Sequence, residues 1–260
     1  MQEAIEGYFS HIKEVERPKC AVIGGCELYT GAPHFAAQTA ALLGADVAVF
    51  CSKGSARSIR SYSLDYTIKP ILGMDSIVET DTWQEELNGF TSVLIGCGLS
   101  RENSYFQSAL NAIVACQNLK ICCIVDADAL YALDMLDSDI FVTNTILTPN
   151  HREFDMLIEK QKFPSCVTLL RKGRVDAAYN GEFDLIREFA TEYRSPRRCG
   201  GQGDVLGGFL LAFSTYFTND VVFLLEIAAN YTRKAVCNAF RQNRRKLTGM
   251  KILEFIQTIV

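Results

Sequence analysis

Short apolar runs rich in β-branched residues alternate along this chain with longer stretches of helical period. In the first unit, Cys20–Ile23 is a predicted strand that ends at Gly24, and Pro33–Leu43 is a predicted helix that precedes a second strand at Val47–Phe50. A parallel strand that is buried on both faces is apolar throughout, as these runs are. The alternation therefore predicts an α/β fold in which parallel strands are joined by crossover helices.

The same pattern continues along the rest of the chain. Further strands are predicted at Ser92–Ile95, Ile121–Val125, Ile146–Thr148 and Val167–Leu170, and further helices at Tyr105–Gln117, Arg152–Glu159, Val205–Thr215 and Val222–Arg241. The less regular segment Asp176–Glu192 contains the turn sequence Tyr179-Asn180-Gly181-Glu182, which predicts a hairpin at an antiparallel edge. With 48% hydrophobic residues and no low-complexity linker, residues 1–260 are predicted to form a single domain.

Glycines and polar residues directly follow five of the predicted strands. In open parallel sheets, ligands bind beyond the carboxyl ends of the strands. We therefore expect the active site at the edge of the sheet that these segments share. The segments are Gly24-Gly25, Gly96-Cys97-Gly98, Asp126-Ala127-Asp128, Pro149-Asn150 and Arg171-Lys172-Gly173.

A glycine-rich run, Ser195–Asp204, precedes the predicted helix at Val205. Its three glycines within four residues allow a tight turn whose N–H groups point one way, and the helix adds the positive end of its dipole. Arg197 and Arg198 are placed to hold further phosphate oxygens. Asp204 is expected to stay ionised and to accept a proton from a hydroxyl. This set of groups suits phosphoryl transfer; the alternative is a glycine loop with an aspartate that caps a helix.

The composition argues against several classes of function. A net charge of −4 and a pI near 5.5 disfavour an extended nucleic-acid surface, and no uninterrupted apolar run approaches the roughly 18 residues of a membrane span. The ten cysteines lie mostly in apolar runs without CxxC spacing, and the three histidines are far apart, which favours a reducing compartment and disfavours a zinc site. The N-terminus lacks the pattern of a signal or transit peptide, so we expect a cytoplasmic location.

The phosphate site is predicted to be of an unusual type. The chain contains no GxxxxGK[ST] loop, and Gly96-Cys97-Gly98 lacks the third glycine of a dinucleotide fingerprint. The segment Leu147–Phe154 resembles the strand-to-helix corner of ribokinase-like enzymes, in which Asn and Glu help to organise the metal and phosphate region. The alternative is a proline-induced turn in which Asn150 caps the helix.

Six segments, taken in order, resemble the ATP-dependent NAD(P)H-hydrate dehydratases. The resemblance spans nearly the whole chain and includes the later segment Ala228–Phe240. The octapeptide Arg-Arg-Cys-Gly-Gly-Gln-Gly-Asp is similar to the eukaryotic branch in particular. The six segments are Tyr29–Pro33, Gly96–Leu99, Asp126–Asp128, Leu147–Phe154, Lys172–Asp176 and Ser195–Asp204.

The resemblance implies a ribokinase-like three-layer αβα sandwich with a mostly parallel central sheet. It also implies a repair enzyme that uses ATP and Mg²⁺ to remove water from (S)-NADHX or (S)-NADPHX, giving NADH or NADPH, ADP and phosphate. The implied chemistry transfers the γ-phosphoryl group to the ring hydroxyl and then eliminates phosphate, which is a better leaving group than hydroxide. The expected functional partner is an epimerase that interconverts the R and S hydrates, and the resemblance also allows a homo-oligomer.

Individual positions carry over from the motifs of the family. Asp204 is expected to be the base on the ring hydroxyl, and Gly201, Gln202 and Gly203 are expected to form the anion hole for the transferring phosphoryl group. Glu153 is expected to act on the metal indirectly. The hydrate-binding positions are expected at Gly98, Asn150, His151, Arg152, Glu153, Phe154, Asp155, Met156 and Asp204, and the ATP-binding positions at Lys172, Gly173, Arg174, Val175, Asp176, Arg194, Ser195, Pro196, Arg197, Arg198, Cys199, Gly200, Gly201, Gln202 and Gly203. For Lys172, the alternative is a solvated surface lysine.

Two other functions are compatible with the sequence. A kinase of the same fold that acts on a vitamin precursor or sugar shares the Gly-x-Gly-Asp anion hole but leaves the phosphate on its product. The segment Arg197–Gln202 favours the dehydratase over this kinase. A non-catalytic nucleotide-binding protein is disfavoured, because a degenerate homologue has no chemical need for Asp204, Lys172, Asn150 and Glu153 together.

Overall fold

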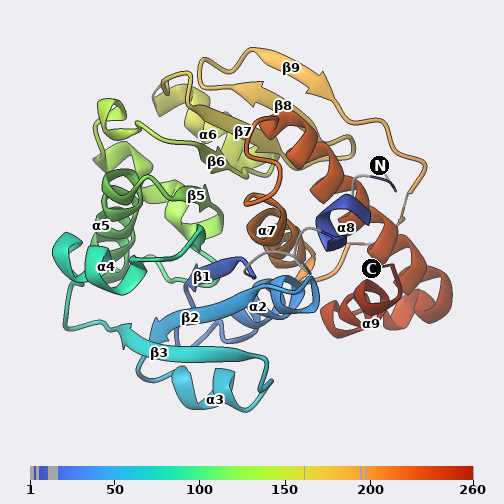
Figure 1. The fold of residues 1–260 in the computed structure, drawn as a ribbon, viewed down its shortest axis with the longest axis horizontal. Coiled ribbons are helices and arrows are strands. Elements are labelled where there is room, and N and C mark those ends of the chain that lie inside the picture. Colours follow the sequence, from blue (N-terminus) through green and yellow to red (C-terminus); the bar gives the residue numbers. More distant parts are fainter. Residues whose placement is uncertain are drawn as a thin grey trace.

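The computed structural model describes residue 3 and residues 6–10, 17–160, 162–193, 195–196 and 198–259. In these residues, a single nine-stranded sheet forms the centre of the fold, with the strand order β3-β2-β1-β4-β5-β6-β7-β8-β9 (Figure 1). The strands are β1 (Lys19–Ile23), β2 (Asp46–Ser52), β3 (Tyr66–Leu72), β4 (Ser92–Ile95), β5 (Cys122–Val125), β6 (Thr145–Leu147), β7 (Val167–Arg171), β8 (Ala177–Asn180) and β9 (Leu185–Glu188).

Strands β1 to β7 are parallel, and β8 and β9 add an antiparallel hairpin at one edge. Both predictions, of a mostly parallel sheet and of an antiparallel edge, are confirmed. Strand β1 lies beside β2 in the register Ile23↔Phe50 and beside β4 in the register Ile23↔Ile95. The carboxyl ends of these strands therefore meet at one edge of the sheet, as expected for the predicted site.

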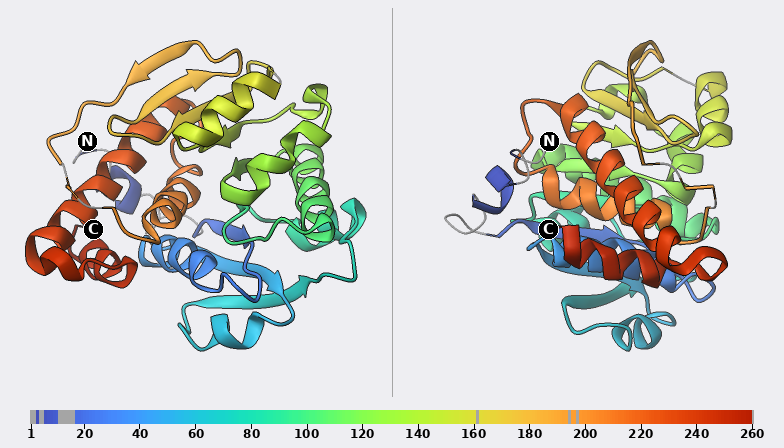
Figure 2. Two further views of the ribbon diagram at one scale, coloured as in Figure 1. Left: turned by 180° about the vertical axis from the view of Figure 1, so that it is seen from behind. Right: turned by 90° about the vertical axis from the view of Figure 1, so that its right-hand side faces the viewer.

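Helices cover both faces of the sheet, which gives the three predicted layers (Figures 1 and 2). On one face α2 packs against α7, α7 against α8 and α8 against α9, whereas on the other face α4 packs against α5, and the 3₁₀-helix η1 contacts α5 and α6. The helices are α2 (Gly31–Leu42), α3 (Ala56–Arg60), α4 (Thr80–Leu87), α5 (Asn103–Leu119), α6 (His151–Lys160), α7 (Gln202–Phe213), α8 (Val221–Asn243) and α9 (Gly249–Ile259), with 3₁₀-helices η1 (Ala127–Met135), η2 (Ser138–Ile140) and η3 (Arg244–Lys246).

Each face of the sheet has its own hydrophobic core. Side chains of successive strand residues point to opposite faces. In β1, Val22 therefore packs into the core that contains Phe209 of α7, and Ile23 packs into the core that contains Ile113 of α5. Because both faces are buried in this way, the central strands are mostly apolar, with polar residues such as Lys19, Asp46 and Ser92 at their first positions, and the sequence pattern identifies these strands directly.

Several elements were not predicted from the sequence. The edge strand β3 contains Lys69 and Pro70, and proline removes a ladder donor and weakens a strand pattern. Helix α4 is short and mostly polar, with only Trp83 and Leu87 buried. The short helix α3, the terminal helix α9 and the 3₁₀-helix η1 were also missed. The described residues of these elements do not line the principal cavity described below.

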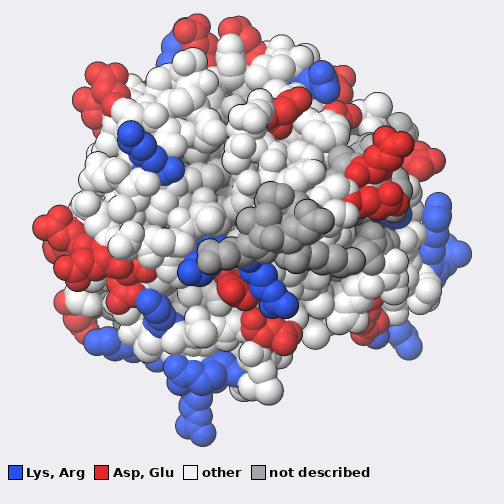
Figure 3. Space-filling view, in the orientation of Figure 1, with Lys and Arg blue, Asp and Glu red and all other residues white. Residues whose placement is uncertain are grey.

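The surface carries mixed charge on the face drawn in Figure 3, where Lys and Arg side chains alternate with Asp and Glu. Within the part of the chain that the structure describes, no helix combines the length and the apolar character needed to cross a membrane.

Candidate active site

The glycine-rich run leads directly into α7, as the sequence predicts, although the helix begins at Gln202 and not at Val205. The helix cap, Gly201, has a φ of +88°, and a Cβ at this position would lie 2.7 Å from the ring of Phe35. Glycine is therefore required for both conformation and space. The first helical hydrogen bond at this end joins the N–H of Val205 to the carbonyl of Gly201 at 2.9 Å. The N–H groups before Val205 have no intrahelical acceptor, so this end of α7 could bind an anion, as the sequence analysis predicts.

Asp204 lies in the first turn of α7 and is only partly exposed. Burial and the negative charge of Asp126 raise the pKa of Asp204 to about 7, although Lys172 and a hydrogen bond from the Cys97 thiol lower it. The expectation that Asp204 stays ionised is therefore corrected, because its carboxyl is close to half-protonated at neutral pH. A carboxylate with a pKa near the working pH is a stronger base than an ordinary aspartate, so the raised pKa suits the predicted role of Asp204, which stays a prediction.

Lys172 connects two strand ends beside this helix. Its Nζ lies 2.5 Å from Oδ1 of Asp126, which follows β5, and its backbone N–H donates to the carbonyl of Pro149 at 2.8 Å. The Lys172 side chain is mostly buried, so it is not a solvated surface lysine. Burial alone lowers the pKa of Lys172, but the Asp126 carboxylate more than compensates and the pKa is raised. The ammonium group therefore stays charged. It also lies close to the start of α7, since a Cβ at Gly203 would be 3.8 Å from the Lys172 Nζ.

Asn150 and Glu153 form a reciprocal cap at the start of α6. Oδ1 of Asn150 accepts hydrogen bonds from the N–H groups of Arg152 (3.0 Å) and Glu153 (3.2 Å), and Oε2 of Glu153 accepts from the N–H of Asn150 (2.8 Å). The helix-capping alternative is thus confirmed for Asn150. Glu153 is buried, and burial raises its pKa, whereas the Asn150 hydrogen bond and the Lys172 charge lower it.

The other hydrate-binding positions expected on α6 do not gather at the site. His151, Arg152 and Asp155 are exposed, and Nε2 of His151 lies 3.8 Å from Oδ2 of Asp155. Phe154 is buried in the core, where its ring lies 4.6 Å from that of Tyr179. Met156 is partly buried against the same core. Successive side chains of an α-helix point about 100° apart, so the side chains of this stretch face several directions, and their role in hydrate binding stays a prediction.

Gly98 lies at the predicted edge, after β4. Its φ is +61°, and a Cβ there would lie 2.7 Å from the carbonyl oxygen of Tyr29. The backbone of the loop between β1 and α2 therefore approaches Gly98 closely. A larger residue at this position would displace that loop, whose Tyr29 side chain is 56% exposed.

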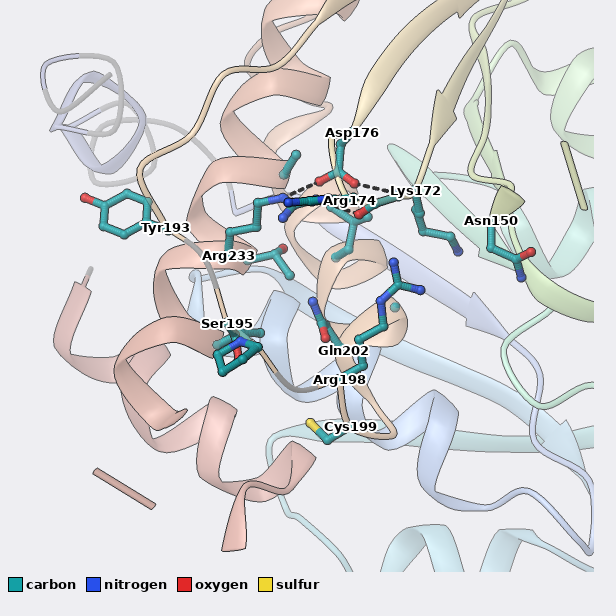
Figure 4. Close-up of a pocket in the computed structure, with 17 residues that line it drawn as sticks. Asn150, Lys172, Arg174, Asp176, Tyr193, Ser195, Arg198, Cys199, Gln202 and Arg233 are labelled. Carbon is teal, nitrogen blue, oxygen red and sulfur yellow. Dashed lines mark hydrogen bonds and ion pairs between the residues drawn. The ribbon is translucent and has the colours of Figure 1, made fainter. Parts of the chain in front are cut away.

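A cavity of about 590 Å³ opens between the end of β7, the glycine-rich run and α8 (Figure 4). It brings together ten of the expected ATP-binding positions, and Asn150 from the hydrate-binding set. The ten are Lys172, Gly173, Arg174, Asp176, Ser195, Pro196, Arg198, Cys199, Gln202 and Gly203. Val175, Gly200 and Gly201 adjoin these residues in the chain without lining the cavity, and Arg194 and Arg197 lie outside the described residues.

Six residues of the cavity wall were missed by the sequence analysis. Four of them, on α8, form the wall that faces the Lys172–Asp176 loop. These four side chains are small, apolar or ion-paired, as on a helix face that packs in the protein core. The sequence pattern therefore could not show that they line a cavity. The six are Tyr193, Leu206, Ala229, Thr232, Arg233 and Val236.

Similarity to known proteins agrees with this geometry. A sequence model of the family described as NAD(P)H-hydrate dehydratase matches residues 20–260. A protein from Drosophila melanogaster named ATP-dependent (S)-NAD(P)H-hydrate dehydratase is 33% identical over 258 residues, which cover 93% of this chain and 85% of the fly protein.

Two solved structures share the fold. A ribokinase-like superfamily protein from Enterococcus faecalis superposes with a TM-score of 0.73 at 17% identity, over 92% of this chain and 85% of that one. The ADP/ATP-dependent NAD(P)H-hydrate dehydratase from Bacillus subtilis, co-crystallised with ATP and Mg²⁺ and soaked with CoA, superposes with a TM-score of 0.68 at 16% identity, over 93% and 90% of the two chains. The fold is therefore ribokinase-like, and the chain belongs to the NAD(P)H-hydrate dehydratase family.

Proposed function

We propose that this protein is an ATP-dependent NAD(P)H-hydrate dehydratase that converts (S)-NADHX and (S)-NADPHX to NADH and NADPH, with release of ADP and phosphate. The observation that carries the proposal is the position of Asp204. This carboxyl, with its pKa raised to about 7, lies in the first turn of α7, beside the N–H groups of an anion site and near the charged Lys172. A base and a phosphoryl-binding site are thus adjacent, as phosphoryl transfer to a hydroxyl requires.

The residues support a two-step reaction. In the first step, Asp204 accepts the proton of the ring hydroxyl while the hydroxyl oxygen bonds to the γ-phosphorus and ADP departs. The N–H groups of Gly201, Gln202 and Gly203, together with Lys172, stabilise the charge on the transferring group. In the second step, the carbon–oxygen bond breaks with its electron pair on phosphate, and the adjacent ring carbon loses a proton to form the double bond. The sum of the steps is loss of water from the hydrate and hydrolysis of ATP.

Magnesium fits this site as an ion shared with the nucleotide. In the described ranges, no three His, Cys, Asp or Glu side chains gather into a metal cage. Mg²⁺ is often held by one or two carboxylates together with substrate phosphates, and the buried carboxylates of Asp126 and Glu153, both close to Lys172, suit that arrangement. When bound, the ion would neutralise charge on the phosphate oxygens. Glu153, whose Oε2 caps α6, would then hold it indirectly, as the family resemblance implies.

The test is to incubate the purified protein with (S)-NADHX, ATP and Mg²⁺ and to follow the return of NADH absorbance at about 340 nm, beside an Asp204→Asn control. Recovery by the wild type alone supports the proposal. ADP formation without recovery of NADH would instead indicate a kinase that leaves its phosphate on the product. A supply of the S hydrate by an epimerase would place the two enzymes in one repair sequence without requiring them to bind each other.

A further inference from the structure

The cavity has cationic and amide groups at one end and a wall of mixed apolar and polar residues from α8 at the other. Lys172 points into it from the end of β7, and Arg198 and Gln202 point into it from the glycine-rich run and the start of α7 (Figure 4). The opposite end lies against α8, where Ala229 and Val236 form the apolar part of a wall that also includes Thr232 and Arg233. A nucleoside triphosphate matches these two ends, with anionic phosphates at one end and a flat, largely apolar base at the other. On the proposed function, the base therefore lies between α8 and the loop that follows β7.

Arg233 of α8 joins that helix to the loop through two hydrogen bonds. Its Nε donates to Oδ2 of Asp176 at 2.6 Å, and its Nη2 donates to the carbonyl oxygen of Gly173 at 2.9 Å. Oδ1 of Asp176 in turn accepts the N–H of Gly173 at 2.9 Å. The side chains of Arg233 and Asp176 are only 16% and 10% exposed, so solvent screens this ion pair weakly. Figure 4 shows the pair across the upper part of the cavity.

These contacts fix the loop in two directions. Both backbone groups of Gly173 are engaged by side chains, while the N–H of the preceding residue, Lys172, donates to the carbonyl of Pro149. The loop therefore cannot move away from α8 unless Arg233 releases it. A planar guanidinium holds two acceptors at once in a defined geometry, which a lysine ammonium does not.

We propose that Arg233 is a positioning residue that sets the width of the nucleobase slot by clamping the 173–176 loop to α8. The proposal rests on the proposed function only in taking ATP as the occupant. Arg233 acts through the loop, because two of its donors are directed at Asp176 and Gly173 and away from the charged end of the cavity. Loss of the clamp should weaken ATP binding while the chemistry at Asp204 continues.

The chain offers a matched control for this experiment. Arg187 of β9 pairs with Glu226 of α8, Nη1 to Oε2 at 3.2 Å, and so joins the hairpin that follows the 173–176 loop to the same helix outside the cavity. Because Arg187 is 56% exposed and Arg233 only 16%, Arg187→Met controls for the loss of an ion pair to α8, and the unfolding midpoint of each variant separates lost stability from lost ATP binding. Arg233→Met leaves the buried carboxylate of Asp176 without its cation, which could unfold the protein. The double variant Arg233→Met/Asp176→Asn removes that charge, so a loss of ATP binding in it is not caused by a buried unpaired carboxylate.

The measurements are the Kd for ATP with Mg²⁺ by calorimetry, the KM for ATP and for (S)-NADHX, kcat, and the thermal unfolding midpoint of each variant. We expect Kd and KM for ATP to rise about tenfold in Arg233→Met and in the double variant, with kcat and the KM for (S)-NADHX changed less than about threefold. Arg187→Met should bind ATP as the wild type does, and Arg233→Lys should be intermediate.

Two results would overturn the inference. One is an ATP affinity in the folded double variant equal to that of Arg187→Met, and the other is full wild-type affinity in Arg233→Lys. Failure of the proposed function gives a different outcome, in which the wild type binds ATP but restores no NADH. The calorimetric arm still tests the clamp in that case, because it needs no second substrate.

Discussion

Replacement of Asp204 by asparagine should abolish activity and, at alkaline pH, make the protein more stable. The carboxyl has an ordinary pKa of 3.8, which burial and the charge of Asp126 raise to about 7 in the folded protein. The folded state therefore keeps the proton more tightly than the unfolded state does. Between these two pKa values, each rise in pH lowers the free energy of unfolding. The ionised form of Asp204, which acts as the base, therefore destabilises the folded protein.

The magnitude follows from the two pKa values. Below the pKa of the unfolded state, the carboxyl is protonated in both states and does not lower the free energy of unfolding. Above the pKa of the folded state, it is ionised in both states, and the free energy of unfolding is lowered by the full amount. Between pH 5 and pH 8, the linkage relation gives a loss of about 2.5 kcal/mol for the wild type, and about 2 kcal/mol once the partial exposure of the side chain is allowed for. The asparagine side chain of the variant does not titrate. For a chain of this length, the difference corresponds to about 5 °C in Tm.

The assay is denaturant unfolding of the wild type and of Asp204→Asn at constant ionic strength, at several pH values from 5 to 8. We expect the variant to gain stability relative to the wild type as the pH rises, with the steepest change below pH 7. In parallel, kcat/KM of the wild type should rise with pH and level off above about pH 7, as the base ionises. A stability difference that does not change with pH would refute the reasoning, because it would mean that the fold does not disfavour the charged carboxyl.

Three further substitutions test other parts of the site. Lys172→Met should lower kcat/KM by about 10³-fold, because it removes a cation beside the phosphoryl group, and should lower the free energy of unfolding by about 3 kcal/mol, because it leaves the buried carboxylate of Asp126 unpaired. A change in kcat/KM of less than tenfold would contradict the role of Lys172. Gly201→Ala should lower the free energy of unfolding by about 2 kcal/mol in denaturant titrations, since its φ is +88° and its Cβ would meet Phe35. The control is Gly200→Ala, whose Cβ meets nothing within 4 Å and which should leave the free energy of unfolding unchanged. Phe154→Ala should cost about 3 kcal/mol with little change in the KM for (S)-NADHX; a large rise in that KM at unchanged stability would restore Phe154 to the hydrate-binding set.

The sequence predicted which segments lie together at the edge of the sheet but not the contacts between their side chains. Fully apolar runs identified the buried strands, and parallel strands place their carboxyl ends together, so the apolar pattern alone assigned the segments after β1, β4, β5, β6 and β7 to one edge. The pairing of Lys172 with Asp126 could not be predicted, because these residues are 46 positions apart and only the packing of β5, β6 and β7 brings them together.

The wall on α8 was missed for a different physical reason. Thr232 and Val236 lie on a helix face that is buried partly against the core and partly beside the cavity. Hydrophobic periodicity reports burial but does not distinguish burial by protein from burial by a ligand. The assignment of residues 150–156 to hydrate binding stays a prediction. A motif is continuous in sequence, whereas a helix presents only some of its side chains to one side, so the structure separates members that the motif groups together.

Asp126 connects the two charges on which the proposed chemistry depends. Its carboxylate keeps the buried ammonium of Lys172 protonated, and its negative charge helps to raise the pKa of Asp204. A neutral residue at position 126 would therefore weaken both the cation that binds phosphate and the base that accepts the proton. Asp126 is itself fixed by accepting the N–H of Ala127 at 2.8 Å, at the point where β5 ends. The strand end thus positions one carboxylate whose field sets the protonation of its neighbours, so the edge of the sheet controls the reactivity of the site and not only its location.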